Sequence, residues 1–239
     1  MFPAGIFTFA GDGIETDKTT MADNIKDTRI AAALFDLDGV IVDTEGYYSD
    51  FWDRIGAGEF GYTHFGSSIK GQTLENIFST YFSCRTDLQK KITDDIDVFE
   101  REMPYEYVPG VMDFIAELKA KGVPRAVVTS SNRKKMENVY ARHPEFRSMF
   151  DRIFTGEDFA RSKPAPDCYL LGMDTFGAAK KSTVIFEDSF SGLKSARDSG
   201  GFVVGLATTN SREAITPLAD LVIDDFTGID TERLLASMS

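Results

Sequence analysis

An apolar run leads directly into a pair of acids in the segment Ile30-Ala31-Ala32-Ala33-Leu34-Phe35-Asp36-Leu37-Asp38-Gly39. A short, continuous apolar run of this kind is typical of a β-strand that is buried on both faces of a sheet. We therefore expect a strand over residues 31–35, with Asp36 and Asp38 directly after its carboxyl end.

Five further apolar runs follow along the chain, and helical patterns separate them. The runs cover residues 126–128, 153–154, 184–186, 202–206 and 221–223. Apolar residues recur at helical spacing over 111–118 and stop at Gly122, and a second helical pattern runs between Pro166 and Gly177. Glycine is a common residue just beyond the end of a helix. The alternation predicts an α/β fold with a doubly wound parallel sheet.

Residues 45–108 interrupt this alternation. Apolar residues recur there at helical spacing over 48–55, 74–82 and 88–99, with no strand pattern between them. We expect a smaller all-helical cap domain, inserted after the first strand. The expected division is a flexible N-terminal extension of residues 1–28, an α/β catalytic core of residues 29–44 and 109–239, and a cap of residues 45–108. Met21 is an alternative start of the chain.

The composition excludes several classes of protein. The 239 residues include 26 Lys and Arg against 38 Asp and Glu, a formal net charge of −12. Such a surface repels phosphate backbones and anionic lipid, so we expect no nucleic-acid partner and no membrane partner. Two cysteines cannot form a disulfide framework, and two histidines cannot form a His-rich zinc site. No secretory signal is expected, since residues 1–10 lack a basic start. We expect a cytoplasmic monomer.

Polar side chains follow three of the expected strands at the point where each strand ends. They are the carboxylates of Asp36, Asp38, Glu187 and Asp188 and the hydroxyls of Thr129 and Ser130. In an open parallel sheet the carboxyl ends of the strands border one crevice, which binds the ligand. Carboxylates crowded there repel one another, and a hard cation with oxygen ligands relieves the repulsion. The sequence therefore predicts a Mg²⁺ site at this edge.

A lysine can reach the same edge. Lys163 lies in Ser162-Lys163-Pro164, after the apolar run at 153–154. An anionic substrate beside a carboxylate nucleophile needs such a cation, because charge repulsion otherwise blocks its approach. This arrangement indicates phosphoryl transfer.

Four ordered motifs resemble those of the haloacid dehalogenase (HAD) superfamily. They are Asp36-Leu37-Asp38-Gly39-Val40, Thr129, Lys163-Pro164 and Glu187-Asp188-Ser189. The helical insertion after the first motif resembles the helical-cap branch, which includes β-phosphoglucomutase and many sugar-phosphate phosphatases. The resemblance covers about residues 29–225.

The resemblance implies a role for each motif residue. Asp36 matches the nucleophile that becomes an aspartyl-phosphate, and Asp38 matches the general acid and base. The groups that match the phosphoryl-binding residues are Thr129, Ser130 and Lys163. The groups that match the metal site are Asp36, the backbone carbonyl of Asp38, Asp188, and Glu187 through water.

The cap bears on the choice between a phosphatase and a phosphomutase. Asp38 favours phosphoryl chemistry, since the dehalogenases of the superfamily lack an aspartate at its position. β-Phosphoglucomutases typically place a histidine and an arginine where this chain has Tyr48 and Leu74, and without the arginine the cap holds a bisphosphate less firmly.

We expect a Mg²⁺-dependent phosphatase of a small phosphorylated metabolite, above all a sugar phosphate. A β-phosphoglucomutase-like mutase is the alternative, and a catalytically silent protein that binds a partner is a third reading.

Cap closure should exclude water and select the substrate. We expect Tyr47, Tyr48, His64 and Lys70 to contribute to substrate specificity. The glycines at Gly56, Gly58 and Gly61 have the spacing of a dinucleotide-binding loop, but they follow a helical pattern instead of a strand. The basic run at 133–135 is interpreted as a solvated helix face that can steer an anion.

Overall fold

A computed structural model describes residues 29–69 and 73–238, so the expected N-terminal extension lies outside the described residues. Six strands form one parallel sheet in the order β3-β2-β1-β4-β5-β6. Their bounds are β1 Ala32–Phe35, β2 Arg125–Val128, β3 Arg152–Phe154, β4 Thr183–Glu187, β5 Phe202–Leu206 and β6 Leu221–Ile223. Each expected strand is present, and its ends differ from the predicted ends by at most one residue. The prediction of a parallel α/β sheet is confirmed.

Strand β1 lies inside the sheet, between β2 and β4. Leu34 of β1 is level with Ala126 of β2 and with Ile185 of β4. Every residue of these three strands is buried, which explains why each contains a continuous apolar run instead of an alternating pattern. The chain proceeds from β1 outward to β3 and then returns to β4 on the other side of β1. This reversal opens a crevice at the carboxyl ends of β1 and β4.

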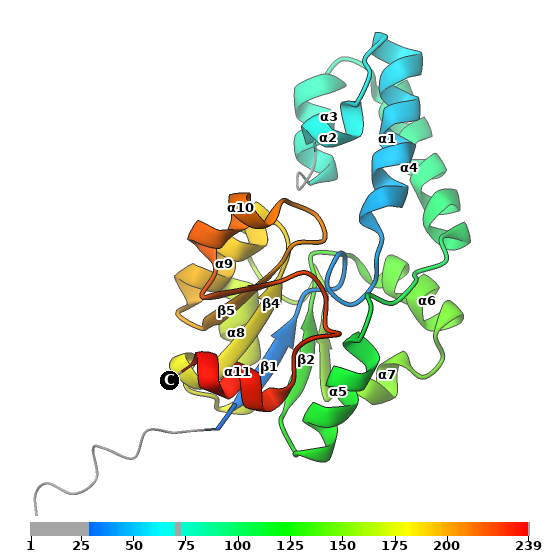
Figure 1. Ribbon diagram of the computed structural model, residues 1–239. Helices are drawn as coiled ribbons and strands as arrows, with labels where there is room; N and C mark the ends of the chain where they lie inside the picture. The colour runs from blue at the N-terminus through cyan, green and yellow to red at the C-terminus, as the bar shows by residue number, and fades with distance from the viewer. Residues whose placement is uncertain (1–28, 70–72, 239) are drawn as a thin grey trace, which may run out of the picture.

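Helices cover both faces of the sheet (Figure 1). One face packs against α5 Val111–Ala120, α6 Arg133–Arg142, α7 Phe146–Met149 and α11 Thr231–Ser237. The other face packs against α8 Asp167–Phe176, α9 Phe190–Ser199 and α10 Arg212–Ile215, and short 3₁₀ turns lie at Lys180–Ser182 and Thr216–Leu218. Gly122 and Gly177 adopt positive φ angles of 69° and 59° beyond the ends of α5 and α8, as their predicted places require.

Four helices between β1 and α5 form an all-helical insertion with its own apolar core (Figure 1). They are α1 Glu45–Phe60, α2 Phe65–Ile69, α3 Leu74–Tyr81 and α4 Thr86–Glu102. The core residues of this helical insert are Phe51, Trp52, Phe65, Ile69, Ile77, Phe82, Leu88 and Ile92. Because these side chains pack mainly on one another, the insert does not need the sheet to bury them. The predicted helical insertion after the first strand is confirmed.

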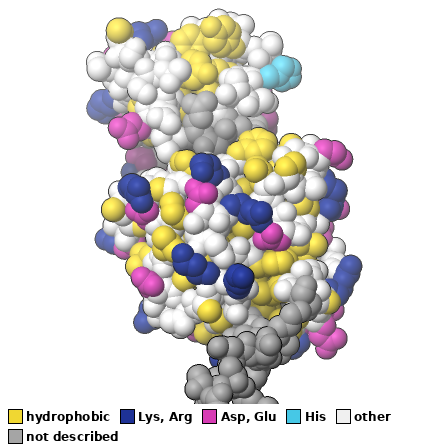
Figure 2. Space-filling model, turned by 90° about the vertical axis from the view of Figure 1, so that its left-hand side faces the viewer, with side chains coloured by type: hydrophobic (Ala, Val, Ile, Leu, Met, Phe, Trp, Pro, Cys, Tyr) yellow, Lys and Arg dark blue, Asp and Glu magenta, His cyan; other side chains and the backbone are white. Residues whose placement is uncertain are grey.

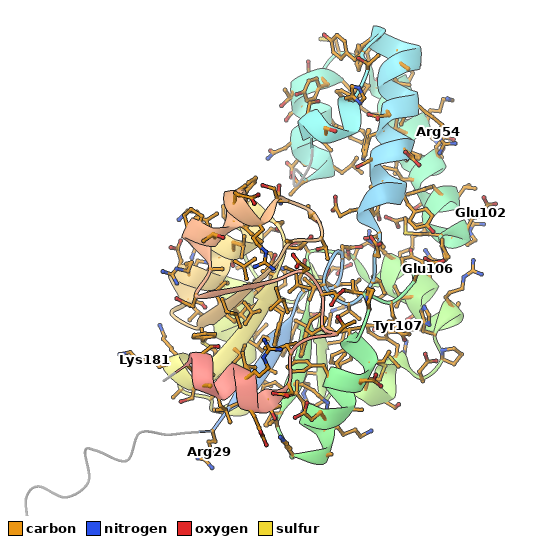
Figure 3. All side chains as sticks on the ribbon, viewed as in Figure 1. Arg29, Arg54, Glu102, Glu106, Tyr107 and Lys181 are labelled. Carbon is orange, nitrogen blue, oxygen red and sulfur yellow. The ribbon has the colours of Figure 1, made fainter. Side chains whose placement is uncertain are left out.

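Two connecting segments join the insert to the sheet, and they lie side by side. The backbone N–H of Asp43 donates to the carbonyl of Glu106 at 2.8 Å, and that of Val108 donates to the carbonyl of Ile41 at 3.0 Å. Figure 3 labels Glu106 and Tyr107, where the chain returns from α4 to the core. These hydrogen bonds fix the point at which the insert leaves and re-enters the core.

The surface carries charges of both signs. On the face shown in Figure 2, Lys and Arg side chains are interspersed with Asp and Glu over the α/β core. Within residues 29–69 and 73–238, none of the helices has the length and apolar character that a membrane span requires.

Candidate active site

The carboxyl ends of β1, β2 and β4 border a cavity of about 430 Å³ beneath the helical insert. Asp36 directly follows β1, Thr129 directly follows β2, and Glu187 is the last residue of β4. The sheet edge contributes Asp36, Asp38, Thr129, Ser130 and Lys163 to the cavity wall. The structure therefore places these five predicted residues around one cavity, although 127 positions of sequence separate Asp36 from Lys163.

Lys163 joins the two central strands through its ammonium group. Its Nζ donates to Asp36 Oδ1 at 2.8 Å, to Glu187 Oε1 at 2.6 Å and to the carbonyl of Val128 at 3.1 Å. Only 5% of the Lys163 side chain is exposed. All three ammonium protons thus have acceptors, so a substrate phosphoryl group at Asp36 would meet a cation whose position is already fixed.

The local charges and the burial shift the pKa values of this group of residues. Burial raises the pKa of Asp36 to about 7, against the opposing effect of the Lys163 charge. Burial acts to lower the pKa of Lys163, but the charges of Asp36 and Glu187 outweigh it and raise that pKa. Lys163 is therefore cationic at neutral pH, while the cost of burying a charge makes Asp36 easier to protonate than an exposed aspartate.

Three acids at the end of β1 and β4 form a candidate metal site. Carboxylate oxygens of Asp36, Glu187 and Asp188 lie within 4.8 Å of one another. Burial, followed by the charges of Glu187 and Asp36, raises the pKa of Asp188 well above its ordinary value. Among the described residues, Asp188 Oδ1 is a buried oxygen without a hydrogen-bond partner. A hard divalent cation such as Mg²⁺ would satisfy that oxygen and offset the repulsion, so these residues fit the predicted metal.

Gly39 makes room for Asp188. Its φ is +72°, and a Cβ built there would lie 2.7 Å from the carboxyl carbon of Asp188 and 2.8 Å from Thr209 Oγ1. The hydroxyl of Thr209 in turn donates to Asp188 Oδ2. A side chain at position 39 would therefore push the Asp188 carboxylate out of the acid cluster.

Glu187 makes more hydrogen bonds within the protein than we expected for a residue that contacts the metal ion through water. Its Oε1 accepts from Lys163 and, at 2.7 Å, from the hydroxyl of Tyr169. Its Oε2 accepts from the backbone N–H groups of Asp188 and Ser189 at 3.1 and 3.3 Å and from the Ser189 hydroxyl at 3.2 Å. Glu187 is 0% exposed, and its carboxylate lies in the space where Gly192 has no side chain. These contacts suit it to hold Lys163 in place.

The two predicted hydroxyls differ in exposure. Thr129 is buried, and its Oγ1 accepts from the backbone N–H of Ser131 at 3.0 Å, which leaves the hydroxyl proton free to donate. Ser130 is exposed and lines the cavity. Both follow β2 and thus stand beside Asp36.

Lys135 is a residue of the site that the sequence analysis interpreted wrongly. It lies in the first turn of α6 with only 6% of its side chain exposed, so it is not part of a solvated face. Its ammonium contacts both carboxylate oxygens of Asp38, at 2.6 and 2.7 Å. The signal was its spacing: Lys135 is four residues before the buried Val139, and residues four apart lie on the same face of a helix.

The groups that donate hydrogen bonds to Asp38 more than offset the effect of burial on its pKa. Burial acts to raise its pKa, whereas the charge of Lys135 and the hydrogen bonds from Lys135, Thr44 and Ser131 lower it, and the net shift is downward. The hydroxyl of Thr44 donates to Oδ1 at 2.6 Å, and that of Ser131 donates to Oδ2 at 2.9 Å. Before substrate binds, these donors thus favour the carboxylate form of Asp38, and Thr44 contacts it from the residue directly before the insert.

The helical insert covers the cavity with a wall of mixed character, to which Tyr48, Ser49, Thr73 and Thr93 contribute hydroxyl groups. Its apolar members are Trp52, Ile69, Leu74, Ile77 and Ile96, and its acidic members are Glu45, Asp97 and Glu100. Among the described lining residues the lysines are Lys135 and Lys163, and both bind carboxylates of the site.

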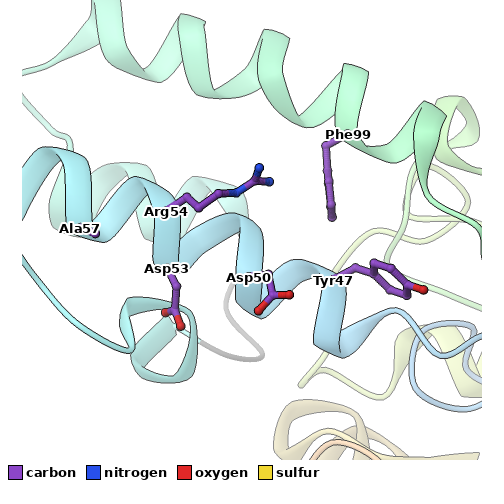
Figure 4. Close-up of a pocket in the computed structure, with 6 residues that line it drawn as sticks. All are labelled: Tyr47, Asp50, Asp53, Arg54, Ala57 and Phe99. Carbon is purple, nitrogen blue, oxygen red and sulfur yellow. The ribbon is translucent and has the colours of Figure 1, made fainter.

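The four residues expected to select the substrate are placed differently from one another. Tyr48 lines the cavity. Tyr47 lies instead in a separate groove with Arg54 and Phe99 between α1 and α4 (Figure 4). His64 is exposed in the turn before α2 and does not line the cavity. Lys70 lies outside the described residues. The α1 helix turns by about 100° per residue, so adjacent tyrosines face different surfaces.

Comparison with protein families gives a match over residues 33–215 to the haloacid dehalogenase-like hydrolases. This range contains all four motifs on which the sequence resemblance rests. The prediction of the superfamily from those motifs is thereby confirmed.

Individual relatives are similar over most of the chain. The chain is 30% identical to a probable pseudouridine-5'-phosphatase of Saccharomyces cerevisiae over 194 residues, which cover 73% of this chain and 81% of that protein. It is 27% identical to the validoxylamine A 7'-phosphate phosphatase of Streptomyces hygroscopicus over 204 residues, 82% of this chain and 94% of that one. The structure resembles β-phosphoglucomutase from Clostridium difficile with a TM-score of 0.71 and 20% identity, over 87% of this chain and 97% of that one. This last likeness concerns the fold alone.

Proposed function

Because the chain belongs to the haloacid dehalogenase-like hydrolase family, we propose that it is a Mg²⁺-dependent phosphatase of a small phosphorylated metabolite, above all a sugar phosphate. The observation that carries this proposal is the Asp36 carboxylate, which Lys163 fixes at the end of a cavity that Thr129 and Ser130 also line. The phosphatase names of the relatives support the same reaction class.

The first half of the reaction transfers the phosphoryl group to Asp36. Its carboxylate oxygen attacks phosphorus while the bond from phosphorus to the ester oxygen breaks, and Asp38, which must take up a proton before this step, gives that proton to the leaving oxygen. The hydroxyls of Thr129 and Ser130 hold the phosphoryl oxygens during this step, and the fixed positive charge of Lys163 beside Asp36 offsets their negative charge.

The second half returns Asp36 to its starting form. Water attacks the phosphorus of the aspartyl-phosphate, Asp38 accepts a proton from that water, and inorganic phosphate leaves. Asp36, Asp188 and the backbone carbonyl of Asp38 would hold Mg²⁺ beside Glu187, and the ion would supply positive charge to the phosphoryl oxygens.

The cavity wall favours water over a second phosphorylated group as the acceptor. A phosphomutase must hold a second phosphate at the insert side of the cavity. That side presents Leu74 and the acids Glu45, Asp97 and Glu100, while Lys135 and Lys163 are occupied by Asp38 and Asp36. A second phosphate would thus meet carboxylates instead of a free cation among the described residues.

The helical insert acts, in this proposal, as a cap of residues 45–108 over a core of residues 29–44 and 109–239. Tyr48 and Trp52 would contact the part of the substrate that leaves, because both line the cavity from α1. The apolar wall and the hydroxyl groups together suit a ring that carries hydroxyls.

The test is phosphate release with and without Mg²⁺ across a panel of monophosphates. The panel contains several sugar phosphates, pseudouridine 5'-phosphate and p-nitrophenyl phosphate, and each reaction is repeated with Asp36→Asn. We expect release that requires the metal and falls by at least about 10⁴-fold in the variant, because no aspartyl-phosphate can form.

Two outcomes would reject the proposal. Conversion of β-glucose 1-phosphate to its 6-phosphate isomer in the presence of a bisphosphate, without net phosphate release, would establish the mutase reaction instead. A complete lack of turnover on the panel and in this assay would leave the protein a partner-binding member of the family.

A further inference from the structure

Asp38 receives four hydrogen-bond contacts from three separate segments. Lys135 of α6 contacts both oxygens, at 2.6 and 2.7 Å. Thr44, at the boundary of the insert, and Ser131, in the loop after β2, each contribute a hydroxyl. Since 97 positions separate Lys135 from Asp38, this contact exists only because α6 packs beside the end of β1.

The ammonium of Lys135 also contacts the helical insert. Its Nζ lies 4.6 Å from the ring centroid of Tyr48, over the ring face. The Tyr48 hydroxyl donates to Glu100 Oε1 at 2.7 Å, which ties α1 to α4. A cation over an aromatic face is attracted by the ring, and more strongly so when it is desolvated. Lys135 therefore connects the core, through Tyr48 and Glu100, to two helices of the insert.

These contacts leave Lys135 little capacity to bind a substrate phosphate directly. An ammonium group has three protons, and here its neighbours are the two oxygens of Asp38 and the π face of Tyr48. Only 6% of the Lys135 side chain is exposed to solvent. Its partners are thus parts of the protein, in contrast to a surface lysine that attracts anions.

We propose that Lys135 is a positioning residue that fixes the Asp38 carboxylate and ties its placement to that of the helical insert through Tyr48. This inference rests on the proposed function, in which Asp38 moves protons to and from the reacting oxygens. Proton transfer requires the carboxylate within hydrogen-bond reach of the reacting oxygen. When the insert shifts over a bound substrate, the ring of Tyr48 shifts with α1, and Lys135 transmits that shift to Asp38.

The substitution Lys135→Met tests the positioning role, because it keeps the length of the side chain and removes the ammonium group. Lys134→Met is the matched control. Lys134 lies next to Lys135 on α6 and also bridges core and insert, through an ion pair with Asp97 of α4, but it has no hydrogen bond to Asp38. If Lys135 only held α6 against the insert, the two substitutions would lower kcat to a similar extent.

We expect Lys135→Met to lower kcat on the best sugar phosphate by about 10²-fold, the lower end of what a positioned acid or base contributes, with KM changed less than about threefold. Lys134→Met should keep both constants within about threefold of the unaltered protein. In an Asp38→Asn background, Lys135→Met should lower kcat by less than about threefold, because the residue it positions is already absent. Tyr48→Leu should lower kcat more in the normal background than in the Asp38→Asn background, where its contact with the substrate is still lost but its link to Asp38 no longer matters.

Three kinetic results would overturn the inference. They are an unchanged kcat in Lys135→Met, an equal loss in Lys134→Met, and a rise in KM that persists in the Asp38→Asn background. The last result would make Lys135 a direct substrate ligand. Thermal unfolding confirms that each variant is folded, and Lys135→Gln replaces Lys135→Met under the same expectations should the latter not fold.

Hydrogen exchange distinguishes failure of this inference from failure of the proposed function. The backbone N–H of Ile41 and that of Val42 donate to the carbonyl of Leu37, and that of Tyr48 donates to the carbonyl of Thr44. We expect these amides to exchange at least about tenfold faster in Lys135→Met than in Lys134→Met, since the segment after Asp38 loses an anchor. A lack of phosphate release by the unaltered protein rejects the phosphatase. Equal exchange in the two variants rejects the positioning role, whatever the activity.

Discussion

The substitution Gly192→Ala should destabilise the protein, although alanine is the better helix former. Gly192 lies in α9, and a Cβ at this position would overlap the carboxylate of Glu187. Glu187 cannot simply turn aside, since Lys163 and Tyr169 bind it at 2.6 and 2.7 Å and it is 0% exposed. The added methyl group must therefore break contacts of a buried ion pair.

The magnitude follows from two opposing contributions. Replacement of glycine by alanine in a helix favours folding by about 1 kcal/mol. Disruption of a buried ion pair costs about 3–5 kcal/mol, because a charge is left without its partner. We expect a net loss of about 2–4 kcal/mol, which lowers the Tm of a chain of this length by roughly 5–15 °C.

Gly58→Ala is the matched control. Gly58 also lies in a helix, α1, but a Cβ there would meet nothing within 4 Å. This variant should be more stable than the unaltered protein by about 0.5–1 kcal/mol. Thermal unfolding followed by circular dichroism measures both. A Gly192→Ala variant as stable as Gly58→Ala would refute the account of how Glu187 is held, and so would full phosphatase activity in Gly192→Ala.

Three further results are expected. Tyr169→Phe removes the hydroxyl donor to Glu187 and keeps the ring, so the free energy of unfolding, measured in urea, should fall by about 2 kcal/mol. An unchanged midpoint of urea unfolding would contradict this. Burial raises the pKa of Asp36 to about 7, so without metal its stabilising proton is present at low pH and is lost as the pH rises through 7. Burial also raises the pKa of Asp188 well above its ordinary value, which has an effect of the same sign. A fixed Mg²⁺ concentration should therefore raise Tm more at pH 8 than at pH 5.5, where the ion must displace protons, and an equal increase at both values would argue against this metal site. Trp52 is the single tryptophan and lines the cavity, so its fluorescence should change when an organic monophosphate binds but not when inorganic phosphate binds. Unaltered emission with a saturating substrate would show that Trp52 does not contact it.

The strands and the predicted acid cluster followed from local patterns of the sequence. The run 30–35 is apolar at every position because both faces of β1 are covered, and the acids come directly after it because the sheet ends there. Parallel strands place their carboxyl ends at one edge, so Asp36, Thr129 and Glu187 could be assigned to one crevice before any distance was known.

The partners within that crevice could not be assigned in the same way. The sequence predicted that Lys163 reaches the sheet edge, but its simultaneous contacts with Asp36 and Glu187 depend on how the loop before α8 packs. Tyr47 and Tyr48 are adjacent and chemically alike, and only the rotation of α1 about its axis determines which of them lines the cavity.

The amino-acid sequence alone thus determined the strands, the helical insertion and the edge at which the acids gather, because periodicity and strand ends are local properties. Tertiary structure decided that Lys135 is buried against Asp38, and that Gly192 leaves space for Glu187. The contact of Lys135 with Asp38 joins segments 97 positions apart, and both arrangements depend on the packing of α6 and α9 against the sheet. Charge and side-chain type show what a residue is able to bind, whereas only packing selects which partner lies within reach.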